Sequence, residues 1–316
     1  MNEIKQSFNF YDQTYLKSYN LNQSIKYQLN LLDSLDIYTR KHSESVATIT
    51  CNLCRKLHLS KGFTEYCTIC AYLHDIGKLF IPSSILQKPA KLTDEEFEIM
   101  KQHTTLGYKL CIKDPKLRPY YAGPYYHHEA LDGTGYPQGL LKKDIPYEAQ
   151  IIRVADEYDA LVNKRQYKSH IGIIDALNIL INNAHPTPPK SLKDGISKMK
   201  YAGVGKIDKK ILKALFKVVI DDTEYEIVAR TDYLKFLKGE IKRIGDAQKY
   251  YTRMMAALTE EKREYYRWEI KCYLKPQEEP EKIPQMHAEF IEAYKMRKEH
   301  LDKLYDELRQ LKRLRI

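Results

Sequence analysis

Two short runs of this chain are dense in histidine and acidic residues. They are residues 74–78, HDIGK, and residues 127–137, HHEALDGTGYP. Imidazole nitrogens and carboxylate oxygens suit divalent transition metals better than they suit ions that prefer thiolates. His42, His103 and Asp156 are further donors at fitting places along the chain. The sequence therefore predicts a metal site with more donors than one ion needs.

The adjacent pair His74-Asp75 sets a geometric condition on this site. Neighbouring side chains on a helix diverge by about 100°, so both can reach one ion only near a helix end. Gly77 is expected to supply that end. Asp75 has two oxygens and can bridge two ions, about 3.5–4 Å apart, that share an activated water. The other donors then fall on two sides, with His42, His74 and Asp156 on one and His103 and His127 on the other.

The elements that position these donors are expected to be helices. Residues 46–57 and 151–161 carry apolar stripes at helical spacing, and no convincing series of alternating strands is found. Thr93, with Glu96 three residues later, is a capping-box pattern that opens a helix carrying His103. The chain is therefore predicted to be all-α.

Between Tyr120 and Ile145, glycine and proline interrupt the helical pattern. This composition predicts an ordered loop rather than a helix, and a loop beside two histidines is predicted to form a substrate rim. Gly133 and Gly135 fit either a close approach of the backbone to a ligand or a plain tight turn. A second irregular stretch, residues 185–205, is interpreted as an insertion or a connection.

From about Asp232 onward glycine nearly vanishes, and long charged residues mix with Tyr, Leu and Met. Two prolines within residues 275–280 predict a break between two long helices, which then form a helical hairpin. The second arm carries an apolar stripe at three-and-four spacing, namely Phe290, Tyr294, Leu301, Leu304, Leu308 and Leu311. Packing on the neighbouring helix of the same chain is the preferred interpretation. The alternative is a short coiled coil that forms a homodimer.

Composition narrows the class of protein. The 316 residues are 43% hydrophobic and 30% charged, which suits a folded core. A net charge of +10 favours anionic partners, but no pattern of a nucleic-acid-binding fold accompanies it, so a nucleic acid polymer is not expected. No run suits a membrane helix, and residues 1–10 lack the apolar stretch of a secretion signal. We therefore expect a cytoplasmic protein.

Two C-x-x-C pairs, Cys51 with Cys54 and Cys67 with Cys70, raise the question of structural zinc. All four cysteines lie in segments with helical periodicity, where a small buried side chain is an ordinary choice. No Gly-rich turn separates the members of either pair. Neither a zinc site nor a disulfide is therefore expected here.

The order of His42, His74, Asp75 and Asp156 resembles that of the HD superfamily of metal-dependent phosphohydrolases. The two motif runs described first resemble those of its HD-GYP branch, over about residues 36–227. This resemblance implies a fold and an activity: an HD-superfamily helical bundle that hydrolyses cyclic di-GMP with two or three iron or manganese ions.

Carried over residue by residue, the resemblance implies metal ligands at His42, His74, Asp75, His103, His127, His128 and Asp156. Asp75 and Lys78 match catalytic positions, and the lysine matches one that contacts the substrate phosphate. The remaining substrate-side positions are Tyr136, Asp159, Arg165 and Lys168. Four of these residues have a simpler alternative: Lys78, Arg165 and Lys168 fit a solvated surface, and Asp159 fits a local cap or pair.

Four residues before His42, where some relatives have a glutamate, this chain has Tyr38. A third metal therefore lacks one expected ligand. We predict two divalent ions, with iron or manganese favoured by the resemblance and nickel or zinc left open by the donor types.

The leading functional hypothesis is an enzyme that hydrolyses cyclic di-GMP to pGpG by a metal-bridged hydroxide, with further hydrolysis to GMP left open. A second hypothesis is a cyclic-dinucleotide sensor that signals to a partner protein through its C-terminal helices. A third is a phosphodiesterase for another cyclic or linear nucleotide. The complete donor set favours catalysis over sensing. The chain is accordingly divided into a helical lead-in, residues 1–35, an HD-GYP catalytic domain, residues 36–230, and a C-terminal helical hairpin or coiled-coil-like extension, residues 231–316.

Overall fold

The structure is a computed structural model that describes residue 32 and residues 34–163, 171–186 and 204–315. All regular elements in these ranges are helices, apart from one isolated β-bridge between Asp132 and Leu141. The all-α prediction is therefore confirmed. No helix within the same ranges combines the length and the apolar character that a membrane span requires.

The chain divides into two compact units between Val219 and Ile220, and the second unit ends at Leu314. This division lies inside α10, Lys209–Met255. The domain limits drawn from the sequence, after residues 35 and 230, stay predictions, and the second of them also falls inside α10.

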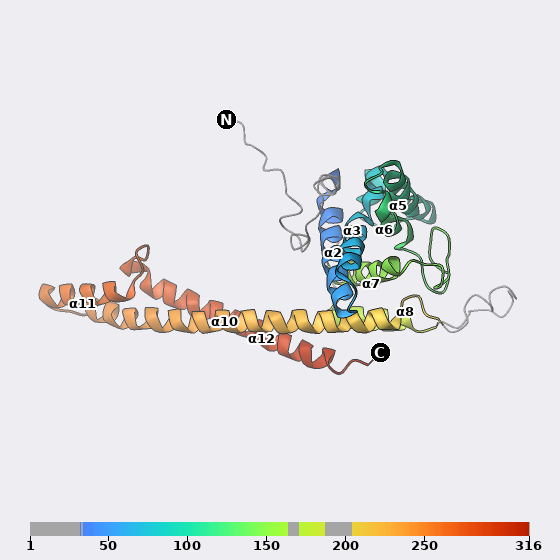
Figure 1. The fold of residues 1–316 in the computed structure, drawn as a ribbon. Coiled ribbons are helices and arrows are strands. Elements are labelled where there is room, and N and C mark those ends of the chain that lie inside the picture. The colour runs from blue at the N-terminus through green and yellow to red at the C-terminus, as the bar shows by residue number, and fades with distance from the viewer. Residues whose placement is uncertain (1–31, 33, 164–170, 187–203, 316) are drawn as a thin grey trace, which may run out of the picture. The chain divides into compact units, whose positions relative to one another are not determined.

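The first unit is built from short and medium helices (Figure 1). They are α2 (Ile37–Lys56), α3 (Lys61–Leu73), η4 (Ile76–Phe80), α4 (Ser83–Leu86), α5 (Asp94–Lys113), η5 (Arg118–Tyr120), α6 (Ala122–Tyr126), α7 (Tyr147–Val162) and α8 (Ile173–Ala184). Helix α2 packs against α3 and α7, while α5 packs against η4 and α6. The elements that carry the predicted donors are therefore neighbours in space.

Side-chain caps fix where the donor-bearing helices begin. The Asp36 carboxylate accepts hydrogen bonds from the backbone N–H groups of Tyr38 and Thr39, which opens α2 ahead of His42. Thr93 and Glu96 form the predicted capping box, with both reciprocal bonds present, at the start of α5. The caps set the register in which α2 and α5 present their histidines.

The predicted loop after Tyr120 contains one short helix, α6, so the prediction of a continuous loop was wrong there. Gly123 and Pro124, which suggested a loop, are both compatible with the helix. A Cβ on Gly123 would lie 2.1 Å from the Cys70 carbonyl oxygen, so this glycine permits close packing of α6 on α3. Pro124 lies in the first helical turn, where its missing N–H costs nothing.

The second unit contains the rest of α10, together with α11 (Glu260–Tyr273), η6 (Pro280–Lys282) and α12 (Ile283–Leu311). The predicted break near residues 275–280 is present, but the first arm is also interrupted before α11, so the extension has three α-helices rather than two. Leu301 of α12 is buried with Ile227, Leu234 and Leu237 of α10, and Leu304 and Leu308 pack on this cluster. The apolar stripe thus packs within the chain, as preferred.

Candidate metal centre

The HD pair lies where α3 ends. His74 is the C-terminal cap of α3, and Asp75 follows before η4 begins, with φ −99° and ψ 7°. Both residues are buried. The prediction that Gly77 supplies the helix end was wrong, because α3 has already ended at Leu73 and Gly77 lies within η4. The condition itself is met, since the chain leaves the helical path between His74 and Asp75.

The donors form two sets around the Asp75 carboxylate. On the Oδ2 side, His42 Nε2 lies at 3.7 Å and His74 Nε2 at 3.3 Å. On the Oδ1 side, His103 Nε2 lies at 3.5 Å and His127 Nε2 at 4.0 Å. Each oxygen of one carboxylate therefore faces a different pair of imidazoles, which is the arrangement expected of a carboxylate shared by two ions.

Asp156 and His128 complete the two sets. Asp156, on α7, places Oδ1 2.9 Å from His42 Nε2 and 4.0 Å from His74 Nε2. Its other oxygen lies 3.9 Å from His128 Nδ1. The donor atoms of His128, His103 and His127 all lie within 4.8 Å of one another. The structure thus brings together all seven residues that were predicted as metal ligands.

Three of the imidazoles are aimed by the backbone behind them. The Nδ1–H groups of His74 and His103 donate to the carbonyl oxygens of Ala71 and Met100, at 2.7 and 2.6 Å. His127 Nδ1–H donates to the Gly123 carbonyl at 2.9 Å. A hydrogen bond from Nδ1 fixes the tautomer and leaves the Nε2 lone pair directed at the centre.

The arrangement of these lone pairs suits a cation. His103 Nε2 and His127 Nε2 lie 3.2 Å apart, although both are acceptors in this tautomer. Two nitrogens bound to one ion at right angles are separated by about 3 Å. His74 Nε2 is buried and has no hydrogen-bond partner within the described part of the chain. Such buried acceptors are costly unless a cation satisfies them, so the residues fit the divalent ions that the sequence predicted.

His42 is held differently from the other imidazoles. Its Nδ1 lies 2.6 Å from Asp159 Oδ2, and Asp159 is buried and also accepts hydrogen bonds from Ser45 and Asn163. The structure thus places Asp159 behind a predicted metal ligand. A carboxylate in this position orients the imidazole and raises its basicity. The substrate role predicted for Asp159 stays a prediction.

The protonation of the imidazoles follows from these surroundings. Burial lowers the pKa of His103 to about 4, and it also lowers the pKa values of His127 and His128 well below the usual range. These three rings are neutral near pH 7, as metal ligands must be. Burial also lowers the pKa of His42, but its bonds to two carboxylates outweigh that effect and raise the pKa to about 9.

Lys78 lies one turn after Asp75, on η4, with its Nζ 2.5 Å from Asp75 Oδ2. Burial raises the pKa of the Asp75 carboxyl, but the charge of Lys78 and the neighbouring His74 lower it more, so the group is ionised. The Lys78 side chain is 16% exposed, which leaves it accessible at the edge of the centre. Arg165 and Lys168, the other predicted basic residues, lie outside the described residues.

Tyr136 lies on the loop between α6 and α7. Its ring centroid is 4.7 Å from that of His128, so the GYP run meets the centre at this ring. Gly135 permits close packing of the loop on its own backbone, because a Cβ would lie 2.2 Å from the Ala130 backbone nitrogen. Gly133 has a φ of 78°, a left-handed backbone conformation that is typical of a tight turn.

Two residues that hold this loop were not identified from the sequence. The buried Glu129 carboxylate accepts hydrogen bonds from the backbone N–H groups of Gln138 and Leu140, at 2.7 and 2.8 Å. Arg153 on α7 donates to the carbonyl oxygens of His128 and Glu129 and pairs with Glu157. Of these contacts, only the ion pair between Arg153 and Glu157 could have been expected from the sequence, because the two residues are four positions apart.

Within the described residues, no cysteine belongs to a group of donors that could hold an ion. The groups of donors that can hold an ion, within the ranges that the structure describes, contain histidine and aspartate alone. Cys51, Cys54, Cys67 and Cys70 are buried as free thiols. Burial raises the pKa of Cys70 and Cys67, which makes thiolate ligands unfavourable there.

The chain is similar in sequence to proteins that are named as phosphodiesterases of cyclic dinucleotides. The chain is 42% identical over 144 residues to the cyclic di-GMP phosphodiesterase of Thermotoga maritima, a match that covers 45% of this chain and 39% of that protein. It is 36% identical over 155 residues to 3'3'-cGAMP-specific phosphodiesterase 3 of Vibrio cholerae, covering 49% of this chain and 34% of that protein. These matches cover under half of the length of either relative.

Among solved structures, the chain is similar to Bd1817, a HDG"Y"P protein from Bdellovibrio bacteriovorus. The identity is 23% and the TM-score 0.43, with 57% of this chain and 52% of that chain covered. The HD domain family matches residues 26–186, about half of the chain. With the HD pair, its partner donors and the GYP loop assembled around one carboxylate, the chain belongs to the HD domain family and is of the HD-GYP type.

Proposed function

We propose that this protein is a metal-dependent phosphodiesterase that hydrolyses cyclic dinucleotides, with cyclic di-GMP as its substrate and pGpG as the first product. One observation carries the proposal: the two oxygens of the buried Asp75 carboxylate face two separate sets of imidazole donors. Relatives that match the donor-bearing segment are named as phosphodiesterases of cyclic dinucleotides, which supports the substrate class.

When bound, two divalent ions would activate water and neutralise charge on the phosphoryl oxygens. The residues of the chain supply the rest. Carbonyl oxygens behind His74, His103 and His127, and the carboxylate of Asp159 behind His42, keep the four rings in position. Preorganised donors of this kind need no rearrangement when the substrate arrives.

Lys78 is proposed to bind a phosphate oxygen. Its ammonium group already lies beside Asp75, and its side chain is 16% exposed. A phosphodiester placed at the centre would meet this charge directly, and a lysine acts there as a compact point charge. Arg165 and Lys168, which lie outside the described residues, are proposed to bind the substrate through their positive charge, as the family resemblance implies.

A second substrate is favoured by a specific observation. Two relatives from Vibrio cholerae, at 36% and 34% identity, are named as 3'3'-cGAMP-specific phosphodiesterases. Cyclic di-GMP and 3'3'-cGAMP share both phosphodiesters and one guanine, so the same donor sets can serve either. The choice between them depends on contacts with the second base.

The test is turnover of cyclic di-GMP, 3'3'-cGAMP and pGpG by protein loaded anaerobically with Mn²⁺ or Fe²⁺. Asp75→Asn keeps the shape of the side chain but replaces one of the two oxygens with an NH₂ group, which cannot face a donor set as a ligand. It should lower turnover at least about 100-fold. Asp144→Asn, at an exposed aspartate before α7, is the matched control and should retain full turnover. Tight binding without turnover would instead indicate a sensor. The absence of both binding and turnover would overturn the proposal.

A further inference from the structure

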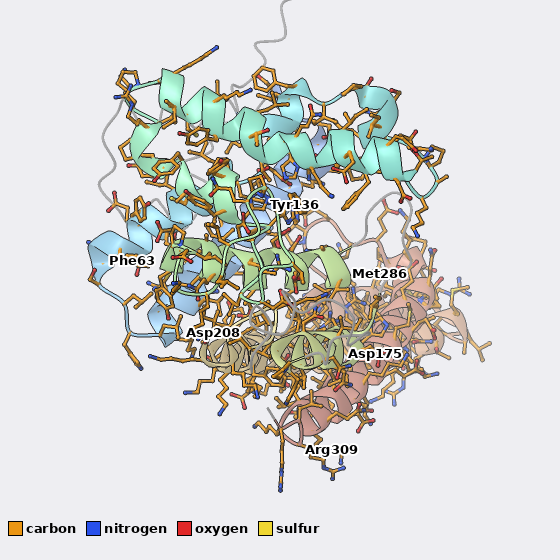
Figure 2. The ribbon with its side chains drawn as sticks, turned by 90° about the vertical axis from the view of Figure 1, so that its right-hand side faces the viewer. Phe63, Tyr136, Asp175, Asp208, Met286 and Arg309 are labelled. Carbon is orange, nitrogen blue, oxygen red and sulfur yellow. The ribbon has the colours of Figure 1, made fainter. Side chains whose placement is uncertain are left out.

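Three side chains form a group on the His128 side of the metal centre. They are Phe97 and Lys101 of α5 and Tyr136 of the loop, and we call them the aromatic shelf. The rings of Phe97 and Tyr136 have centroids 6.4 Å apart and planes at 80° to each other. Lys101 Nζ lies 5.0 Å from the first centroid and 5.7 Å from the second. In Figure 2, Tyr136 lies just beneath α5.

The aromatic shelf continues outward from the metal centre. The Tyr136 ring lies 4.7 Å from that of His128, at 31°, and 6.5 Å from that of His103. The His103 side chain is 1% exposed, that of His128 is 26% exposed, and Phe97 is 44% exposed. Exposure therefore rises from His103 through His128 to Phe97, and the outer end of the group faces solvent.

Lys101 is able to respond to a ligand. Its ammonium group pairs with Glu98 at 2.6 Å, but the Glu98 side chain is 67% exposed. Exposed pairs of this kind contribute little stability, so an oxygen of a ligand can replace the glutamate. The flexible stem of a lysine lets the ammonium group follow that oxygen.

We propose that the aromatic shelf binds one nucleobase of the cyclic dinucleotide whose phosphate lies at the metal centre. This inference rests on the function proposed above, and it adds Phe97 and Lys101 to the residues that contact the substrate. The base stacks on the Phe97 ring, the Tyr136 ring stands at the side of the base, and Lys101 pairs with an oxygen of the ligand.

The distances and the chemistry agree with this assignment. In a nucleotide the ribose separates the base from its phosphate, so a base reaches roughly one side chain beyond the phosphate site. Phe97 lies about one side chain beyond the predicted ligand His128, because the Tyr136 ring lies between them. Every base has a π-face, and stacking on an aromatic ring is worth about 5- to 150-fold in affinity per base.

The test compares Phe97→Ala and Phe97→Leu with wild type in the metal-loaded protein. Both variants should raise KM for cyclic di-GMP at least about fivefold and leave kcat within about twofold. Inhibition by GMP should weaken by a similar factor, whereas inhibition by inorganic phosphate, which has no base, should not change. Phe97→Tyr retains a ring and should behave as wild type.

Phe236→Ala is the matched control. Phe236 is 51% exposed, and Lys275 Nζ lies 5.7 Å from its centroid, so the pair repeats the chemistry of Phe97 and Lys101 in the second unit. This variant should leave KM unchanged. Lys101→Met, which keeps the stem and removes the charge, should raise KM for cyclic di-GMP.

Two failures can be told apart. If wild type turns over cyclic di-GMP but both Phe97 variants retain its KM, or lose GMP and phosphate inhibition equally, the aromatic shelf binds no base and the inference is wrong. If wild type turns over no cyclic dinucleotide at all, the proposed function fails first and the inference fails with it.

Discussion

Replacement of Gly77 by alanine tests how the two donor sets are held at their spacing. Gly77 lies in η4, two residues after Asp75, and packs on α5. A Cβ at this position would lie 1.9 Å from the His103 carbonyl oxygen and 2.6 Å from the Gly107 backbone nitrogen. Both atoms belong to the backbone, so no side chain can turn aside to make room.

The required movement follows from these distances. Reaching an ordinary contact of 3.4 Å demands that η4 and α5 separate by about 1.5 Å. Asp75 Oδ1 and His103 Nε2, now 3.5 Å apart, are carried by these two elements. Misplacement by about 1 Å can cost about 100-fold in catalysis, and overpacking typically costs about 1–3 kcal/mol of stability. We therefore expect Gly77→Ala to lose metal, and to unfold between a few and about 10 °C lower than wild type.

The assay is elemental analysis of metal bound after dialysis, together with thermal unfolding of the same samples. Gly62→Ala is the control, because nothing lies within 4 Å of a Cβ at that position of α3. Alanine in a helix is favoured over glycine by up to about 1 kcal/mol, so the control should not be destabilised. The reasoning is refuted if Gly77→Ala binds as much metal as Gly62→Ala and unfolds at the same temperature.

Three further outcomes are expected. Glu129→Gln should lower the free energy of unfolding by about 1–3 kcal/mol in urea titrations, because a buried carboxylate that accepts two backbone N–H bonds is replaced; an unchanged midpoint would contradict this. Asp159→Asn should weaken Mn²⁺ binding about 10- to 100-fold in equilibrium dialysis, with Asp144→Asn as control. In the metal-free protein the pKa of His42 is about 9, above the ordinary 6.5, so its stabilising contribution is present below pH 6.5 and is lost as pH rises through 9. The thermal unfolding temperature should therefore fall more between pH 6.5 and pH 9 in wild type than in His42→Asn.

Much of the centre could be predicted because its donors occur in contiguous or strictly ordered motifs. His74 is adjacent to Asp75, and His127 is adjacent to His128. The capping box at Thr93 and Glu96 indicates the start of the helix that carries His103. These features depend on local spacing alone, which is what a sequence displays.

The residues that hold the donors could not be predicted in the same way. Asp159 meets His42 across 117 positions of the chain, and Arg153 meets the carbonyl oxygen of His128 across 25. Such contacts depend on how α2, α7 and the loop pack together. The same holds for α6, since Gly123 suggested a loop by type but serves close packing against Cys70.

The three imidazoles that donate to carbonyl oxygens do so within three or four residues of their own position in the chain. Their aim is therefore a local property of the turns that carry them, one inside α5 and two at helix ends, and it is complete once those turns have formed. We therefore expect the folded protein to take up metal without refolding. The composition of the centre would then be set by the metals available after the chain has folded, rather than by those present while it is made.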